Sequence, residues 1–350
     1  MPFVDLHCDT IARLLACRRA GLPGQLRTGE GAHVTLEKLQ RSGYLLQNFA
    51  LFVNLQGETP PPGEGAGAED LYRLSMGCRA GSPLEEVLTL ADLYWTEMAA
   101  NEDLAVPVRS FQEMERARQA GKIACLLTVE EGGVCLGSLP LLRTLYRLGV
   151  RMLTLTWNYP NELGRPNGQP GGLTRRGFQF LEEMENLGMI PDVSHLSDDG
   201  VWDVCRAARK PFVASHSSCR ALHPHRRNLT DAMLRALADR GCLVGVNFYA
   251  GFLGPHGTSR LADLTRHIRH MIQVGGLDLV ALGSDFDGID CPLELEDAGH
   301  MDRLVQAMEG AGFTPGRLRR CAGKTPGNFT GGFCKPWSFE KTRENRRNIL

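Results

Sequence analysis

The sequence lacks a long hydrophobic run, an excess of charge and a secretory signal, and each absence excludes a class of protein. No stretch of 18 or more apolar residues occurs, so we expect no membrane-spanning helix. The formal net charge is −1, which predicts neither a nucleic-acid partner nor attraction to an anionic membrane. The beginning of the chain, MPFVDLHCDT, has no basic segment followed by an apolar one, so we expect no signal peptide.

A regular cysteine framework is also absent. The eleven cysteines are an odd number, scattered without a repeating spacing. Several of them, such as Cys125, Cys205 and Cys242, fall within predicted strands or helices, where they are typical of small buried hydrophobic residues. This usage favours a reducing compartment over an oxidising one, so we expect a cytoplasmic protein.

Short apolar segments alternate with longer amphipathic ones along the chain. The apolar segments are rich in Val, Ile and Leu, which is typical of parallel strands buried on both faces. They cover residues 3–7, 45–53, 122–130, 151–157, 189–195, 211–216, 243–248 and 279–285. Segments with helical periodicity lie between them. Examples are residues 139–148, 177–187, 199–209, 231–240 and 264–274.

Eight strands with intervening helices predict an α/β protein with a single (β/α)8 TIM barrel over residues 1–350. An open doubly wound sheet would instead need a glycine-rich phosphate loop after its first strand, and His7-Cys8-Asp9 is not one. Residues 56–70 are rich in Gly, Pro and Glu, which predicts a mobile surface loop, with a lid over the site as a second interpretation. Residues 332–350 are polar and basic, and we expect a frayed C-terminal tail.

Imidazole and carboxylate groups interrupt the apolar pattern at the ends of five predicted strands. The carboxyl ends of barrel strands meet at one rim, where catalytic groups lie. The residues concerned are His7, Asp9, Glu130, Glu131, His195, His216 and Asp285. Any one of them alone is more often a hydrogen-bonded buried residue. Together they would be costly at one rim unless a cation compensates them, so the sequence predicts a metal site.

The number of these groups favours two ions over one. His7 and Asp9 are two residues apart, so in an extended segment both side chains project to the same side while Cys8 faces away. Three histidines and two or three carboxylates exceed the three protein ligands of a typical catalytic zinc site. We therefore expect a pair of ions that share a bridging carboxylate and hold a hydroxide between them.

Seven segments, taken in chain order, carry a resemblance to a known family: DLHCDT, TVEEGG, LGVRMLTLTWN, DVSHLS, SHSSCRALHPHRRN, VNFY and GSDFDG. They resemble the membrane (renal) dipeptidases and their bacterial relatives, peptidase family M19, over nearly the whole chain. The resemblance implies a barrel of the metal-dependent hydrolase type with two Zn²⁺ ions. It also implies cleavage of dipeptides, in several members those with a D-residue on the C-terminal side.

By that resemblance, His7 and Asp9 bind one zinc ion, His195 and His216 bind the other, and a glutamate bridges the two. Counting back from residues 143–146 without gaps favours Glu130 as the bridge, whereas adjacency to the following glycines favours Glu131. Strand alternation allows only one of the two to face the ions. We favour Glu130 and expect Glu131 to be solvated.

The same resemblance assigns further residues. Asp285, in SDFDG, matches the family's acid/base aspartate, and we interpret Asp287 as a turn residue before the next glycine. Arg227 matches the arginine that pairs with the terminal carboxylate of the substrate, and we interpret Arg226 as a surface residue. His223 and His225 lie in a proline-containing loop and are not expected to bind metal: only the spacing favours them.

Two departures from the family pattern bear on the substrate. Trp157 stands where the mammalian enzymes have a histidine that helps to hold the substrate carbonyl, and an indole cannot accept a hydrogen bond. Asn158 is our candidate for that substrate contact. Phe252 replaces a tyrosine that joins Arg227 at the carboxylate.

The leading hypothesis is a zinc-dependent dipeptidase, with a small dipeptide as its partner molecule. One alternative keeps the barrel and the metals but acts on another small amide, a lactone or an ester. A second alternative is a metal-dependent ligand-binding protein that has lost catalysis, which Trp157 favours. The sequence leaves the choice between a monomer and a homodimer open.

Overall fold

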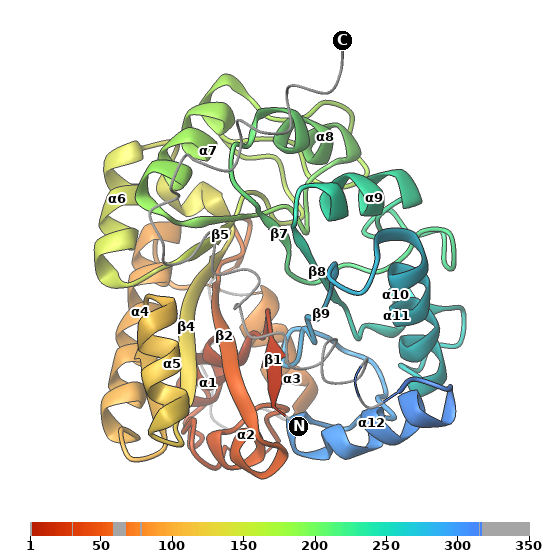
Figure 1. Ribbon diagram of the computed structural model, residues 1–350. Helices are drawn as coiled ribbons and strands as arrows, with labels where there is room; N and C mark the ends of the chain where they lie inside the picture. Colours follow the sequence, from red (N-terminus) through yellow and green to blue (C-terminus); the bar gives the residue numbers. More distant parts are fainter. Residues whose placement is uncertain (1, 30, 59–67, 78, 315, 317–350) are drawn as a thin grey trace.

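The computed structural model describes residues 2–29, 31–58, 68–77, 79–314 and 316. Within this part of the chain the strands form one central sheet, and helices surround it (Figure 1). In the described part of the chain, no helix is both long and apolar enough to span a bilayer.

Eight parallel strands close into a barrel, which confirms the predicted (β/α)8 fold. The strands are β1 (Phe3–Asp5), β2 (Tyr44–Phe52), β4 (Ile123–Glu130), β5 (Met152–Thr154), β6 (Ile190–Asp192), β7 (Val213–Ala214), β8 (Leu243–Val246) and β9 (Val280–Leu282). Their order is β2-β1-β9-β8-β7-β6-β5-β4, and pairing of β2 with β4 closes the ring. Every residue of β2 and β4 is buried, as expected for strands covered on both faces.

A ninth strand, β3 (Ala105–Val108), was not predicted. It pairs with the first half of β4 and lies at the edge of the sheet, outside the closed ring. Its sequence, AVPV, contains Pro107, and a proline argues against a central strand because it cannot donate to the ladder. At the edge of the sheet, proline is tolerated because one side of the strand needs no backbone donor.

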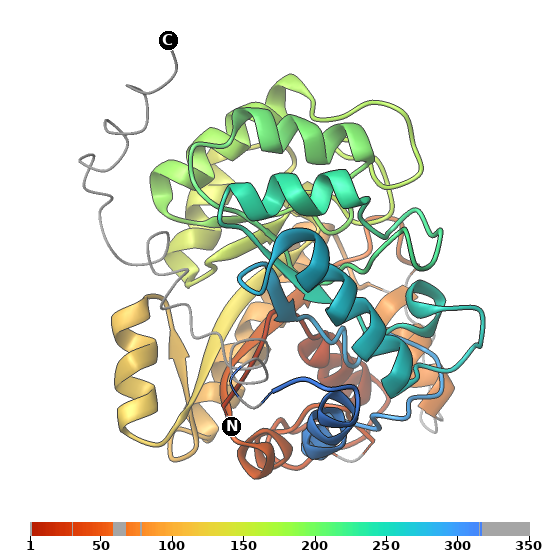
Figure 2. The ribbon, with the colours of Figure 1, turned by 45° about the vertical axis from the view of Figure 1, so that its right-hand side comes forward.

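Helices cover the outside of the barrel. Within the described residues they are α1 (Thr10–Arg19), α2 (Leu36–Ser42), α3 (Ala68–Gly77), α4 (Pro83–Ala100), α5 (Phe111–Gln119), α6 (Leu139–Leu148), α7 (Arg175–Leu187), α8 (Asp198–Ala207), α9 (Asp231–Asp239), α10 (Ala250–Leu253), α11 (Leu261–Gly275) and α12 (Met301–Gly310). At the start of α8 and α9, the side chains of Ser197 and Thr230 accept hydrogen bonds from backbone N–H groups of the first turn, which stabilises both helix ends. Figure 2 shows α11 lying beside α9 on the outside of the barrel.

The two segments set apart by composition fall mostly outside the described residues. Residues 59–67 of the predicted loop and all of the predicted tail at 332–350 are not described. The end of the predicted loop is helical, because α3 begins at Ala68. Leu71 and Leu74 of α3 pack against Ala16 and Cys17 of α1, so burial of this apolar face anchors α3 beside the mouth of the barrel.

His267 of α11 is a buried neutral histidine that ties the helix to the segments that follow β7 and β8. Its Nδ1 accepts a hydrogen bond from the backbone N–H of Cys219 at 3.0 Å. Its Nε2 lies 3.0 Å from the carbonyl oxygen of Leu253, to which it donates. Both ring nitrogens are therefore used by the neutral form, and burial lowers the pKa of His267 to about 4.

This histidine predicts a loss of stability in acid. The unfolded chain binds a proton at His267 near pH 6.5, whereas the folded chain does so only near pH 4, so a falling pH favours unfolding between these values. From pH 7 to pH 5 the wild-type protein should lose about 2 kcal/mol more unfolding free energy than the His267→Gln variant. Urea denaturation of both proteins at the two pH values measures the difference. Parallel pH profiles would contradict the assignment.

Candidate active site

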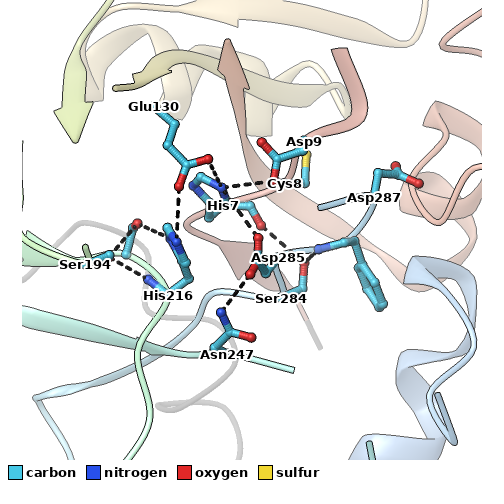
Figure 3. A network of polar contacts seen from close by, with 12 residues as sticks. His7, Cys8, Asp9, Glu130, Ser194, His216, Asn247, Ser284, Asp285 and Asp287 are labelled. Atoms are coloured by element: carbon cyan, nitrogen blue, oxygen red, sulfur yellow. Dashed lines mark hydrogen bonds and ion pairs between the residues drawn. The ribbon is translucent and has the colours of Figure 1, made fainter. Parts of the chain in front are cut away.

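Glu130, the last residue of β4, lies at the centre of a cluster of imidazole groups. Its Oε2 is 3.5 Å from Nε2 of His7, which follows β1 (Figure 3). Its Oε1 is 2.9 Å from Nε2 of His195 and 3.4 Å from Nε2 of His216. The two oxygens of this carboxylate thus face different histidines, which follow β1, β6 and β7.

Two further carboxylates lie near the same nitrogen of His7. Nε2 of His7 is 3.2 Å from Oδ2 of Asp9, which caps α1, and 3.7 Å from Oδ1 of Asp285, which follows β9. Oδ2 of Asp285 accepts a hydrogen bond from Nδ2 of Asn247 at 2.8 Å, and its Oδ1 is left facing the cluster. The structure therefore brings together six of the seven strand-end residues from which the sequence predicted a metal site, and Glu131 is the exception.

The ring orientation of two histidines follows from their hydrogen bonds. Nδ1 of His195 lies 3.1 Å from Oδ1 of Asn158, and Nδ1 of His216 lies 2.7 Å from Oγ of Ser215. Ser215 donates to a carboxylate oxygen of Asp192 at 2.6 Å, so its oxygen is free to accept from His216. Each histidine therefore carries its proton on Nδ1 and directs the lone pair of Nε2 into the cluster.

The resulting arrangement fits a cation. The Nε2 atoms of His195 and His216 are 2.8 Å apart, and two lone pairs repel each other at this distance unless a positive charge lies beside them. Ligand atoms of the described residues form two overlapping groups that could hold metal ions and that share His7. The groups are His7–Glu130–His216 and His7–Asp9–Asp285, each with its atoms within 4.8 Å of one another.

The charges of the cluster also favour a bound cation. Burial acts to lower the pKa of His7, but Glu130 and Asp9 raise it well above the usual value. Burial acts to raise the pKa of Glu130, but His7 and the other two histidines hold it well below the usual value. The pKa of Asp9 is well above its usual value because of burial. Three carboxylates thus surround one histidine that attracts a proton, and divalent cations would neutralise the excess negative charge.

Glu131 does not face the cluster, but the prediction that it is solvated is wrong. Its side chain is fully buried, and its backbone has a φ of +104°. Its carboxylate accepts hydrogen bonds from the N–H of Gly133 at 2.7 Å, the N–H of Trp157 at 3.0 Å and Nδ2 of Asn161 at 2.5 Å. Burial raises the pKa of Glu131 to about 7. This glutamate ties the end of β4 to the segment after β5.

Asp287 also lies apart from the cluster (Figure 3). It occupies a turn with a φ of +66°. Its carboxylate accepts hydrogen bonds from Oγ1 of Thr10 at 2.7 Å and from the N–H groups of His33 and Val34 at 2.7 and 3.3 Å. These contacts join the end of β9 to α1 and to the segment before α2.

A cavity of about 330 Å³ opens beside Glu130 and Asp285. Arg227 lies in its wall, only 5% exposed, with its guanidinium 5.4 Å from the ring centre of Phe252. Its Nη2 donates to the carbonyl oxygen of His216 at 3.3 Å, whereas its Nε and Nη1 have no partner among the described residues. Burial lowers the pKa of Arg227 to about 10. An anion in the cavity would supply an acceptor for these unpaired N–H groups.

The cavity also contains the residues that depart from the family pattern. Trp157 lines it with its ring edge-on to Phe52, at a centroid distance of 4.8 Å. Asn158 and Arg226 line it as well and are solvent-exposed. His225 lies in the wall, and its Nδ1 accepts from the N–H of Arg227 at 3.1 Å.

Sequence reasoning missed the residues that hold the histidines in place. Asn167 donates through Nδ2 to Oδ1 of Asn158 at 3.0 Å and through its backbone N–H to the carbonyl oxygen of His195 at 2.8 Å. It lies in an irregular segment that has no periodic signal. Asp192 and Ser194 are different, because they are polar residues within and directly after an apolar strand, and that interruption could have marked them.

A parallel (β/α)8 barrel whose strand ends gather imidazoles and carboxylates around one point defines the class of metal-dependent hydrolases. Residues 1–325 match the sequence profile of the membrane dipeptidases, peptidase family M19, and the chain belongs to that family. It is a metallo-dipeptidase.

Solved and curated relatives agree with this membership. The chain is similar to the crystal structure of the dipeptidase AC, a metallo peptidase of family M19, with a TM-score of 0.79, 27% identity, and coverage of 95% of this chain and 97% of that one. It is also similar to a metallo peptidase from Rhodobacter sphaeroides bound to a phosphinate mimic of the dipeptide L-Ala-D-Ala, with a TM-score of 0.77, 26% identity, and coverage of 95% and 98%. An uncharacterized dipeptidase of Schizosaccharomyces pombe is 40% identical over 197 residues, which are 54% of this chain and 47% of that protein.

Proposed function

We propose that this protein is a zinc-dependent dipeptidase with a binuclear site. His7 and Asp9 bind one Zn²⁺, His195 and His216 bind the other, and Glu130 bridges the two. The observation that carries the proposal is the position of Glu130, whose two oxygens face different histidines at 2.9 to 3.5 Å. Imidazole and carboxylate groups are the ligands of catalytic zinc.

The remaining site residues would bind the dipeptide and move protons. When bound, a pair of zinc ions activates water as hydroxide at neutral pH and polarises the scissile carbonyl. Asp285 accepts the proton of the attacking water through the oxygen that faces His7 and passes it to the leaving amine. Arg227 pairs with the terminal carboxylate through its guanidinium group, which has unpaired N–H donors.

Asn158 would contact the substrate in the place where related enzymes use a histidine. Its Oδ1 is held by His195 and Asn167, so the amide nitrogen is the group left to donate. Donation to the substrate carbonyl would take over the role of that histidine. The likeness to the enzyme bound to an L-Ala-D-Ala mimic supports acceptance of a D-residue on the C-terminal side. A cytoplasmic location rests on the eight cysteines of the described residues, all of which are free.

Hydrolysis of a small panel of dipeptides tests the proposed function. We expect metal-free protein reconstituted with Zn²⁺ to cleave both L,L- and L,D-dipeptides, and we expect a chelator to reduce the rate to background. Release of free amino acids, measured against added zinc, should reach its maximum at two ions per chain. Cleavage of lactones or esters without any dipeptide cleavage would overturn the proposal, and saturation at one ion would overturn the binuclear site.

A further inference from the structure

Three arginines lie between β7 and α9, and only one of them has a carboxylate partner among the described residues. Arg220 forms a two-pronged ion pair with Asp198, with N···O distances of 2.5 and 2.7 Å. Arg227 faces the cavity with two free nitrogens. The guanidinium of Arg226 has no hydrogen bond or ion pair to any described residue. Two neighbouring arginines at one cavity are therefore left without an ion-pair partner among the described residues.

A backbone hydrogen bond and a packing contact hold Arg226 at the cavity. Its carbonyl oxygen accepts a hydrogen bond from Nη2 of Arg220 at 3.1 Å, which holds the backbone beside Arg227. Its side chain passes over Gly168, where an added Cβ would lie 2.6 Å from Cδ of Arg226. Gly168 has a φ of +75°, so the turn itself favours glycine and leaves room for the arginine. The stem is thus packed although the charged end is exposed.

No carboxylate balances this end of the cavity. Among the described residues that line it, the acidic ones are Glu130 and Asp285, and both belong to the cluster around His7. The pKa of His225, which also lines the cavity, is lowered by burial and then by Arg227 and Arg226. The cavity is therefore positive at the end where the substrate's terminal carboxylate would bind.

We propose that Arg226 is a specificity residue that binds a second carboxylate, carried by the side chain of an aspartate or glutamate at the C-terminal position of the dipeptide. This inference rests on the proposed function. The terminal carboxylate and the side chain of one residue leave the same Cα, so two adjacent guanidinium groups can take one carboxylate each. Arg227 is buried and takes the terminal carboxylate, and Arg226 at the exposed rim takes the side chain.

The test compares substrates that have the same shape and differ in charge. For the wild-type protein we expect kcat/KM for alanyl-glutamate to exceed that for alanyl-glutamine by roughly 10-fold, because a charge-assisted hydrogen bond is added. In Arg226→Gln this ratio should fall to about 1, because kcat/KM for alanyl-glutamate decreases while kcat/KM for alanyl-glutamine stays the same. Arg226→Lys should restore part of the ratio. Both stereoisomers of the C-terminal residue are measured.

Arg235→Gln is the matched control, since this exposed arginine lies on α9 and does not line the cavity. It should leave the ratio within about twofold of the wild-type value, because distant surface charges are screened. A ratio that is the same in wild type and Arg226→Gln, or that falls equally in Arg235→Gln, overturns the proposal. Failure of the proposed function looks different, because then neither dipeptide is cleaved by any of these proteins.

Discussion

Replacing Glu130 by glutamine is expected to remove both metal binding and hydrolysis. Glutamine has the same shape but carries an NH₂ group, which would face either His7 or the pair His195 and His216. The variant also loses the one charge that both sides of the cluster share. We expect kcat/KM to fall by roughly 1,000-fold or more, with less than two zinc ions retained per chain after dialysis. Elemental analysis and dipeptide hydrolysis on the same sample measure both effects.

Glu131→Gln is the control for this variant, because the neighbouring glutamate is equally buried but binds Gly133, Trp157 and Asn161 instead of the histidines. Its amide group would place a donor against N–H donors, so we expect a lower melting temperature with two zinc ions retained. The bridging role of Glu130 is wrong if Glu130→Gln keeps both ions, or if folded Glu131→Gln loses them.

The comparison of these two glutamates shows what a sequence pattern can and cannot predict. Neighbouring side chains of a strand point to opposite faces, and this rule predicts that Glu130 and Glu131 do not face the same side, as observed. It does not state what lies on the second face. In a barrel covered by helices that face is protein and not water. The turn at Glu131, with its positive φ, then brings three N–H groups to the carboxylate.

The barrel strands were predictable for a related reason. Each is an apolar run, and five of the runs end in imidazole or carboxylate groups. The rule that strand ends share one rim then brought distant residues such as His7 and Asp285 together. β3 was not predicted, because Pro107 argues against a strand in the middle of a sheet. The role of Asn167 was not predicted either. This residue lies in an irregular segment and acts through two hydrogen bonds, which leave no periodic pattern in the sequence.

The role of Asp285 leads to the second large expected effect. Its Oδ2 is held by Asn247 at 2.8 Å, while its Oδ1 faces Nε2 of His7 at 3.7 Å. Asparagine would keep the size of the side chain and could still accept a hydrogen bond, but it could not take a proton from water. We therefore expect Asp285→Asn to lower kcat by roughly 100- to 10,000-fold, with KM changed little and both zinc ions retained. Steady-state kinetics with metal analysis of the same preparation give the result.

Metal content decides between two roles for this aspartate, because its Oδ1 also belongs to the group of ligand atoms with His7 and Asp9. A proton carrier can be replaced without loss of an ion, whereas a ligand cannot. Asp287→Asn supplies the control: Asp287 follows two residues later but binds Thr10, His33 and Val34, so its loss should lower stability and leave kcat within a few-fold. If Asp285→Asn loses one zinc ion, Asp285 is a metal ligand, and the proton must pass through another group at the cavity.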